Sequence, residues 1–284
     1  MKKVIRLIIF FFVSLFALSA VASIIFVARN RPQLEELIRT RVACTEHVSA
    51  ASSAKAPQIL FVGNSLTFYY MTPNTVSKFA ESLCKARPEV YQLVIPGVSL
   101  EDHYKIGRYQ SLLREQKFDY VVLQEQSFRS LNDTKPTIEY GQKMAALARQ
   151  AGAKVFLFET WADRNRLDDQ SKIAANASLV AGKIDAQLIR IGDAFFYCRS
   201  RFPEIDLYAP DSHHPSPCGS YLASCLLFQS LYRRPSIGAP AKADFDFGFL
   251  KLPVVAVAPD IAAKLQKAAD SVAQSQPPES EPAR

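Results

Sequence analysis

Residues 59–67 are Ile-Leu-Phe-Val-Gly-Asn-Ser-Leu-Thr. The first four form a short, unbroken apolar run, which is typical of a strand buried on both faces of a parallel sheet. The run ends at a turn, Gly63-Asn64-Ser65, and a helix is predicted from residue 73 to residue 86, with Pro73 suited to its first turn. The segment therefore predicts a strand–turn–helix unit.

The same alternation recurs along the chain. Apolar runs predict further strands at residues 91–95, 120–123, 155–158 and 188–191. Helical periodicity predicts helices at residues 99–116, 136–151, 168–186, 217–232 and 260–273. Strands that alternate with helices of this length predict an α/β fold with a five-stranded parallel sheet covered on both faces.

Length and composition limit the classes of protein that this chain can be. It has 284 residues, of which 49% are hydrophobic and 11% aromatic, which is too apolar for a disordered chain. The net charge is +7, but Lys2, Lys3 and Arg6 contribute to it and the remaining charges form no basic run. A nucleic-acid partner is therefore not expected, because it would need clustered cations on one face. Residues 58–273 are predicted to form one domain.

The N-terminal segment predicts a membrane anchor. Residues 7–28 carry no charge, and about 20 apolar residues span a bilayer as a helix. Small residues up to Ala22 fit a cleavage site, yet the apolar run continues beyond them. Residues 1–28 are therefore predicted to be an uncleaved signal-anchor, or a signal peptide if cleaved after Ala22. The domain is expected outside the cytoplasm, after a juxtamembrane linker at residues 29–57 and before a disordered, proline-rich tail at residues 274–284.

Five cysteines, at positions 44, 84, 198, 218 and 225, contain no C-x-x-C pair. This spacing argues against a zinc site or a thioredoxin-like redox site. Up to two disulfides, or several small buried thiols, are both compatible with it.

Polar residues that follow the predicted strands suggest acyl-transfer chemistry, because ligands of open α/β sheets bind beyond the carboxyl ends of the strands. A serine in the first turn, Ser65, would need a neighbouring base. Of the four histidines, His47 lies in the linker and His103 lies on a predicted helix, where it is interpreted as a surface residue or, alternatively, as lining the cleft near Gly97. This leaves the loop at residues 211–215. In that loop Asp211 precedes His214 by three residues, close enough to orient an imidazole.

Other interpretations of these residues stay open. The Gly-Asn-Ser turn alone is compatible with a simple tight turn. Asp211, His213 and His214 could be metal ligands, although their spacing supports this weakly. Trp161 follows the fourth predicted strand and is either a stacking surface for a sugar or a packing residue. The P-loop, G-x-G-x-x-G, H-E-x-x-H and G-x-S-x-G motifs are absent, so no metal or cofactor is predicted.

Taken together, the motifs resemble those of the SGNH (GDSL-like) hydrolase family over about residues 56–233. Residues 61–67 resemble its first block, Gly97 lies in a match to the second, and residues 211–216, Asp-Ser-His-His-Pro-Ser, match the last. The resemblance implies a three-layer α/β/α, flavodoxin-like fold. It also implies Ser65 as nucleophile, His214 as base, Asp211 as its orienting acid, and the N–H groups of Ser65 and Gly97 in an oxyanion hole.

The chain departs from the family pattern at two places. Asn64 stands where the family usually has aspartate, and residues 124–127, Gln-Glu-Gln-Ser, replace the Gly-x-Asn-Asp of the third block. The family's asparagine donates a side-chain N–H to the oxyanion. Glutamine offers the same amide, so Gln124 is the candidate donor and Gln126 the reserve.

These features predict a membrane-tethered or exported serine ester hydrolase that needs no cofactor. The expected substrate is a small-molecule or glycan ester with a short acyl group of the O-acetyl type. Two alternatives remain, an O-acyltransferase to a glycan with the same triad, and a catalytically silent binding module suggested by the altered third block.

Overall fold

A computed structural model describes residues 46–53, 55–246 and 251–274 of the chain. The predicted signal-anchor at residues 1–28, the linker up to residue 45, Cys44 and the tail from residue 275 lie outside these residues. Within the described part of the chain, no helix combines the length and the apolar character that crossing a bilayer requires.

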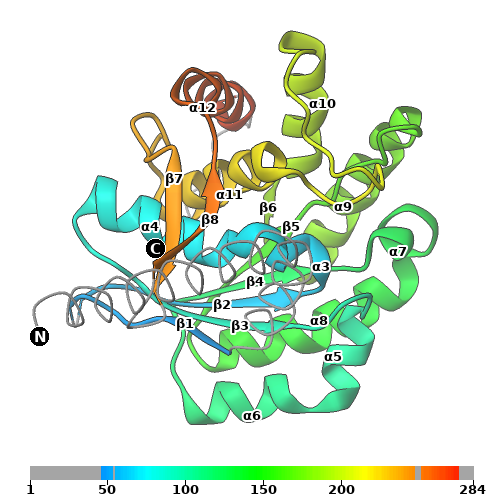
Figure 1. The fold of residues 1–284 in the computed structure, drawn as a ribbon. Helices are drawn as coiled ribbons and strands as arrows, with labels where there is room; N and C mark the ends of the chain where they lie inside the picture. The colour runs from blue at the N-terminus through cyan, green and yellow to red at the C-terminus, as the bar shows by residue number, and fades with distance from the viewer. Residues whose placement is uncertain (1–45, 54, 247–250, 275–284) are drawn as a thin grey trace, which may run out of the picture. The chain divides into compact units, whose positions relative to one another are not determined.

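The central sheet has six strands, β1 (His47–Ser49), β2 (Gln58–Gly63), β3 (Glu89–Val94), β4 (Tyr120–Gln124), β5 (Lys154–Phe158) and β6 (Gln187–Ile189). Their spatial order is β1-β3-β2-β4-β5-β6 (Figure 1). Strands β3, β2, β4, β5 and β6 are parallel to one another, and β1 pairs with β3 in the antiparallel sense. The parallel strands thus follow the flavodoxin-like order, which confirms the predicted fold class. The prediction of five strands was wrong by one, because β1 is a three-residue strand within the segment interpreted as linker.

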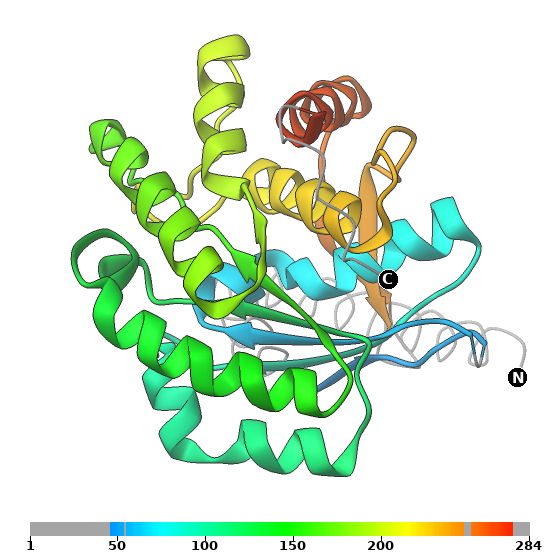
Figure 2. The same cartoon turned by 180° about the vertical axis from the view of Figure 1, so that it is seen from behind.

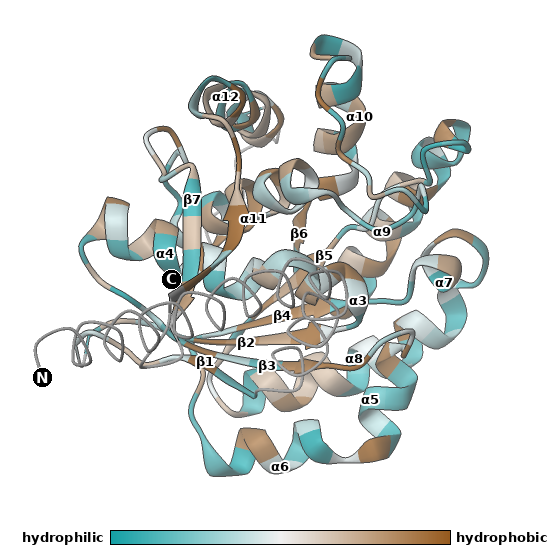
Figure 3. Cartoon of the chain, in the orientation of Figure 1, coloured by the Kyte–Doolittle hydropathy of each residue, from teal (hydrophilic) through white to brown (hydrophobic). Residues whose placement is uncertain are grey.

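Helices cover both faces of the sheet (Figures 1 and 2). One face carries α5 (Leu100–Ile106), α6 (Arg108–Glu115), α8 (Thr134–Gln150) and α9 (Gln170–Ile184), and the other carries α4 (Thr72–Cys84) and α11 (Pro217–Tyr232). Alternate strand residues such as Leu60 and Val121 pack against the first set, with Tyr109 and Met144 fully buried between them. Figure 3 shows the apolar strands at the centre and more polar outer helices. Because helices cover both faces of the sheet, successive residues of the central strands are buried on one face or the other, and these strands are largely apolar.

Beyond the sheet, α10 (Ile191–Arg201) and α12 (Pro259–Gln274) pack near α11, and β7 (Lys242–Asp246) pairs with β8 (Lys251–Ala256) as an antiparallel hairpin. The hairpin, α10 and the short α7 (Ser127–Asn132) were not predicted. The helix predicted at residues 99–116 is two helices, because Gly107 adopts φ 83° between them. The four cysteines in the described part of the chain are free thiols, and Cys198 and Cys225 are buried.

Candidate active site

The first turn of the predicted pattern lies at the switch point of the sheet, where β2 is flanked by β3 and β4. Ser65 is the first residue of α3 (Ser65–Phe68), and Asn64 caps this helix by accepting the Leu66 N–H at 3.1 Å. Ser65 is half-buried. A strand in the middle of the sheet therefore carries the serine to the edge where ligands bind.

The structure brings together the three residues predicted to form a triad. Ser65 Oγ lies 2.9 Å from His214 Nε2, and His214 Nδ1 lies 2.6 Å from Asp211 Oδ2. The other carboxylate oxygen, Asp211 Oδ1, accepts the backbone N–H groups of His213 and His214 at 3.0 and 2.9 Å. The loop before α11 is thus folded around the aspartate, which fixes the imidazole toward the serine.

The charge of Asp211 sets the tautomer of His214. Partial burial opposes ionisation, but hydrogen bonds from the imidazole and the two backbone N–H groups outweigh it and lower the pKa of Asp211 to about 2. The carboxylate is therefore ionised at neutral pH and can only accept a hydrogen bond, so Nδ1 carries the hydrogen that is donated to it. A neutral His214 consequently presents the Nε2 lone pair to the serine hydroxyl, the arrangement that a general base needs.

Tyr69 packs on one face of the His214 ring. The ring of Tyr69 stacks on the His214 ring with centroids 4.2 Å apart and planes 10° apart. The next two residues, Tyr70 and Met71, have φ 51° and 53°, a left-handed conformation that costs about 1–2 kcal/mol per residue. Hydrogen bonds from Thr72 Oγ1 and Ser220 Oγ to the Tyr69 carbonyl hold this segment in place. Sequence reasoning missed Tyr69, because no sequence pattern marks this backbone.

The structure gives Gln124 a different role from the predicted one. Its Oε1 accepts the Asn64 N–H at 2.8 Å and the Thr67 hydroxyl at 2.9 Å, and its Nε2 donates to the Glu125 carbonyl. The side chain is 1% exposed. One of its two amide N–H donors is thus used within the fold, and burial leaves the other little access to a substrate oxyanion. Gln124 instead binds the nucleophile turn to the end of β4.

The reserve candidate, Gln126, is differently placed. It is half-buried at the start of α7, and its Oε1 accepts the Arg129 N–H at 3.0 Å as the cap of that helix. Its Nε2 has no hydrogen-bond acceptor within the described residues. Gly97 lies in an exposed turn with φ 73°, and the neighbouring Val98 carbonyl accepts from Asn64 Nδ2 at 3.1 Å. An aspartate at position 64 could not make this bond, so Asn64 joins the turns after β2 and β3.

The interpretation of His103 as a helix-surface residue was wrong. It is only 3% exposed, and its Nε2 lies 2.8 Å from the Gly63 carbonyl. Burial lowers the pKa of His103, so the ring is neutral and donates to that carbonyl. Glu125 makes a similar link, since its Oε1 accepts the N–H groups of Leu100 and Gln126 at 3.2 and 2.7 Å. Helix α5 is thereby fixed to the ends of both β2 and β4.

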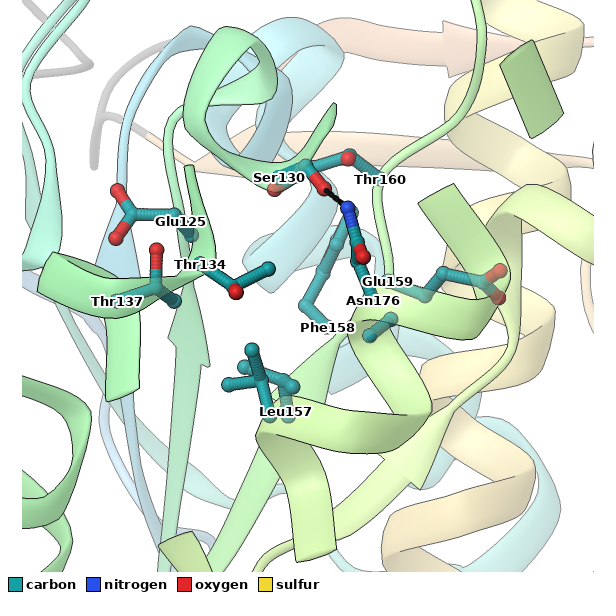
Figure 4. Close-up of a pocket in the computed structure, with 11 residues that line it drawn as sticks. Glu125, Ser130, Thr134, Thr137, Leu157, Phe158, Glu159, Thr160 and Asn176 are labelled. Carbon is teal, nitrogen blue, oxygen red and sulfur yellow. Dashed lines mark hydrogen bonds between the residues drawn. The ribbon is translucent and has the colours of Figure 1, made fainter. Parts of the chain in front are cut away.

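A pocket lined by both polar and apolar side chains lies beside the ends of β4 and β5, and Ser65, Asp211 and His214 do not line it (Figure 4). Glu125 and Glu159 lie on opposite sides of it, and Asn176 Nδ2 donates to the Ser130 carbonyl at 2.9 Å. Burial, followed by the nearby charge of Asp193, raises the pKa of Glu159 to about 8, and burial also raises the pKa of Glu125. Glu159 is therefore largely protonated at neutral pH and adds little negative charge near the site.

The structure bears on two interpretations that the sequence left open, the role of Trp161 and a metal site that includes His213. Trp161 is 2% exposed and stacks on Phe195 with centroids 4.2 Å apart, so it is chiefly a packing residue. The described part of the chain contains no group of three or more side chains that could hold a metal ion. His213 points instead to Asp163, with 2.6 Å between Nδ1 and Oδ1.

The chain was compared with protein-family models, curated proteins and solved structures. No protein-family model and no curated protein matches the chain. Among solved structures, a protein from Slackia heliotrinireducens assigned provisionally to the SGNH hydrolases is 27% identical, with 62% of this chain and 100% of that chain covered and a TM-score of 0.55. A DUF4886 family protein from Bacteroides uniformis is 17% identical, with 78% and 96% covered and a TM-score of 0.59. The acetyl xylan esterase AlAXEase is 18% identical, with 61% and 99% covered and a TM-score of 0.50.

Proposed function

We propose that this chain, an ester-hydrolysing enzyme of the SGNH (GDSL-like) hydrolase family, cleaves short-chain esters through Ser65, His214 and Asp211. The observation that carries the proposal is the continuous chain of two contacts from Ser65 Oγ to His214 and from His214 to Asp211, at 2.9 and 2.6 Å. One structural relative is named an acetyl xylan esterase, which is a reason to test acetyl esters first.

The proposed reaction begins when Ser65 Oγ attacks the ester carbonyl carbon and its proton moves to His214 Nε2. Asp211 stabilises the imidazolium that forms. The negative charge on the carbonyl oxygen is bound by the N–H groups of Ser65 and Gly97 and by the Gln126 amide. When the intermediate collapses, the alcohol leaves with the proton from His214, and water then releases the acid by the same steps.

A fluorophosphonate probe tests the proposal directly, because only an activated serine reacts with it. Labelling is expected at Ser65, located by mass spectrometry, and is expected to be absent from the Ser65→Ala variant. Failure to label would favour the silent binding module. Product analysis with a glycan present separates hydrolysis from acyl transfer, since transfer leaves the acyl group on the sugar.

The oxyanion assignment makes a separate prediction. Gln126→Ala is expected to lower kcat by about 10²- to 10³-fold, because one donor to the transition state is lost, and to cost only about 1 kcal/mol of stability through loss of the α7 cap. Gln124→Ala is expected to lower the denaturant midpoint as well, because the buried Asn64 N–H loses its acceptor. Kinetics and urea unfolding of both variants check this. Equal changes in kcat and in stability for the two variants would contradict the assignment.

A further inference from the structure

The pocket next to His214 contains a second histidine–aspartate pair that the proposed triad does not use. His213 and His214 are consecutive, with ring centroids 4.9 Å apart and planes at 82°. The pocket encloses about 590 Å³ of space, part of it open to solvent. Its lining includes Ser127, Asp163 and His213 as polar groups and Phe128 at 67% exposure.

The orientation of His213 is fixed by its neighbours. Its Nδ1 lies 2.6 Å from Asp163 Oδ1, so the ring donates there and directs the Nε2 lone pair away from the aspartate. Nε2 lies 3.5 Å from Ser127 Oγ, too long for a strong hydrogen bond. The His213 carbonyl accepts from Trp161 Nε1 at 3.0 Å, which anchors the backbone. His213 Nε2 and the Ser127 hydroxyl thus both face the pocket, and they are too far apart to form a strong hydrogen bond with each other.

The position of the pocket indicates which part of an ester it meets. In the proposed reaction His214 returns its proton to the leaving alcohol, so the alcohol part lies on the side of the histidine. The His213 ring lies with its centroid 4.9 Å from that of His214, and we therefore assign its pocket to the alcohol side. The acyl part, bonded to the carbon that Ser65 attacks, extends away from the proton donor.

The chemistry of the lining indicates the class of alcohol. Leu131, Ala162 and Ile173 form an apolar cluster, while His213, Ser127 and the Arg166–Asp169 pair at 2.8 Å supply polar edges. A purely alkyl group would desolvate these polar atoms without replacing their hydrogen bonds. A strongly anionic group would meet two aspartates, Asp163 and Asp169. A sugar matches this combination of apolar and polar groups. Its C–H faces can pack on Phe128, and its hydroxyl groups can form hydrogen bonds with the polar side chains of the pocket.

We propose that this pocket binds the alcohol part of the ester as a sugar, with His213 Nε2 accepting a hydrogen bond from a hydroxyl group near the ester oxygen. Asp163 is a positioning residue that holds His213 for this contact. The inference rests on the proposed ester hydrolysis and adds its substrate class.

Kinetics with matched esters test the proposal. The panel contains methyl glycosides of glucose, xylose and N-acetylglucosamine with one O-acetyl group each, and cyclohexyl acetate, a ring of similar size without hydroxyl groups. At least one sugar acetate is expected to exceed cyclohexyl acetate in kcat/KM by tenfold or more. His213→Gln and Asp163→Asn are expected to lower that value about 10- to 100-fold, the range for a lost hydrogen bond in a binding site. Cyclohexyl acetate turnover is expected to change less than threefold.

Asp185→Asn is the matched control, because this side chain is 90% exposed and lies on the opposite end of α9 from the pocket-lining Ile173. It is expected to leave every rate unchanged. Equal losses on sugar and cyclohexyl esters in the His213 variant, or the absence of any preferred sugar acetate, would overturn the proposal.

A binding measurement separates this proposal from the proposed function. Trp161 is the single tryptophan of the chain and lines the pocket, so its fluorescence reports on occupancy without catalysis. Titration with the unacetylated methyl glycosides is expected to change the emission of the wild type and to require at least tenfold more sugar in the His213→Gln variant. Sugar binding without fluorophosphonate labelling would refute the hydrolase alone. Labelling without any sugar response would refute the sugar pocket alone.

Discussion

Replacing Ser65 by alanine is expected to lower kcat/KM for a short-chain acetyl ester by about 10⁴- to 10⁶-fold, the range for loss of a triad nucleophile. The hydroxyl oxygen is the atom that forms the acyl-enzyme, and neither His214 nor a bound water at the same place can replace it without a new geometry. The hydroxyl contacts His214 Nε2 at 2.9 Å. The fold should therefore be unaffected, and steady-state kinetics together with the urea midpoint measure both effects.

Ser178→Ala is the control for this variant. Ser178 is exposed on α9, where alanine is a better helix former, so activity and stability are expected to stay at or slightly above those of the wild type. Residual activity above one-tenth of the wild-type value in Ser65→Ala, with a preparation free of contaminating esterase, would remove Ser65 from the proposed mechanism.

Gly63→Ala is expected to have the largest effect on stability. A Cβ atom at this position would lie 2.4 Å from Gln124 Oε1 and 2.5 Å from Thr67 Oγ1, which is far inside van der Waals contact. Gln124 would have to move, and the buried Asn64 N–H would lose the acceptor that lies 2.8 Å away. A loss of about 2–4 kcal/mol in the free energy of unfolding is expected, from overpacking and the lost hydrogen bond. Displacement of the serine turn should also lower kcat/KM by about 10²-fold.

Gly182→Ala provides the contrast within the same chain. A Cβ atom there meets nothing within 4 Å, and the residue is exposed in α9. Alanine should therefore stabilise the protein by up to about 1 kcal/mol through its higher helix propensity. Chemical denaturation of the two variants and the wild type gives the comparison. Similar midpoints for all three would mean that the contact between Gly63 and Gln124 is not a close constraint.

The central parallel strands could be predicted because they are buried on both faces and consist largely of apolar residues. Residues 59–62 and 120–123 are examples, and the strands β2 and β4 extend them by only one or two residues. The strand β1 could not be found in the same way, since three residues cannot display a period. The hairpin does alternate, with Ala243 and Phe245 buried, but its period of two was not recognised among the many helical signals.

The candidate site divides in the same way. The proximity of Ser65, Asp211 and His214 could be predicted because each follows a strand or lies in a short loop with a recognisable spacing. The choice between Gln124 and Gln126 could not, because it depends on where each amide points after the strand ends. His103 was misinterpreted because a single histidine on a helix does not reveal which face the sheet covers. Asp163 and Tyr69 are joined to histidines only by the tertiary fold.

The residues of the proposed triad lie on two different kinds of segment. Ser65 follows a strand with hydrogen-bonded neighbours on both sides, whereas Asp211 and His214 sit in a loop closed by bonds such as Ala209 N–H to the His214 carbonyl at 2.8 Å. Segments of this kind open locally at a lower free energy than the sheet does. Inactivation by mild denaturant can therefore precede global unfolding and be fully reversible, with the base detached from an otherwise native molecule.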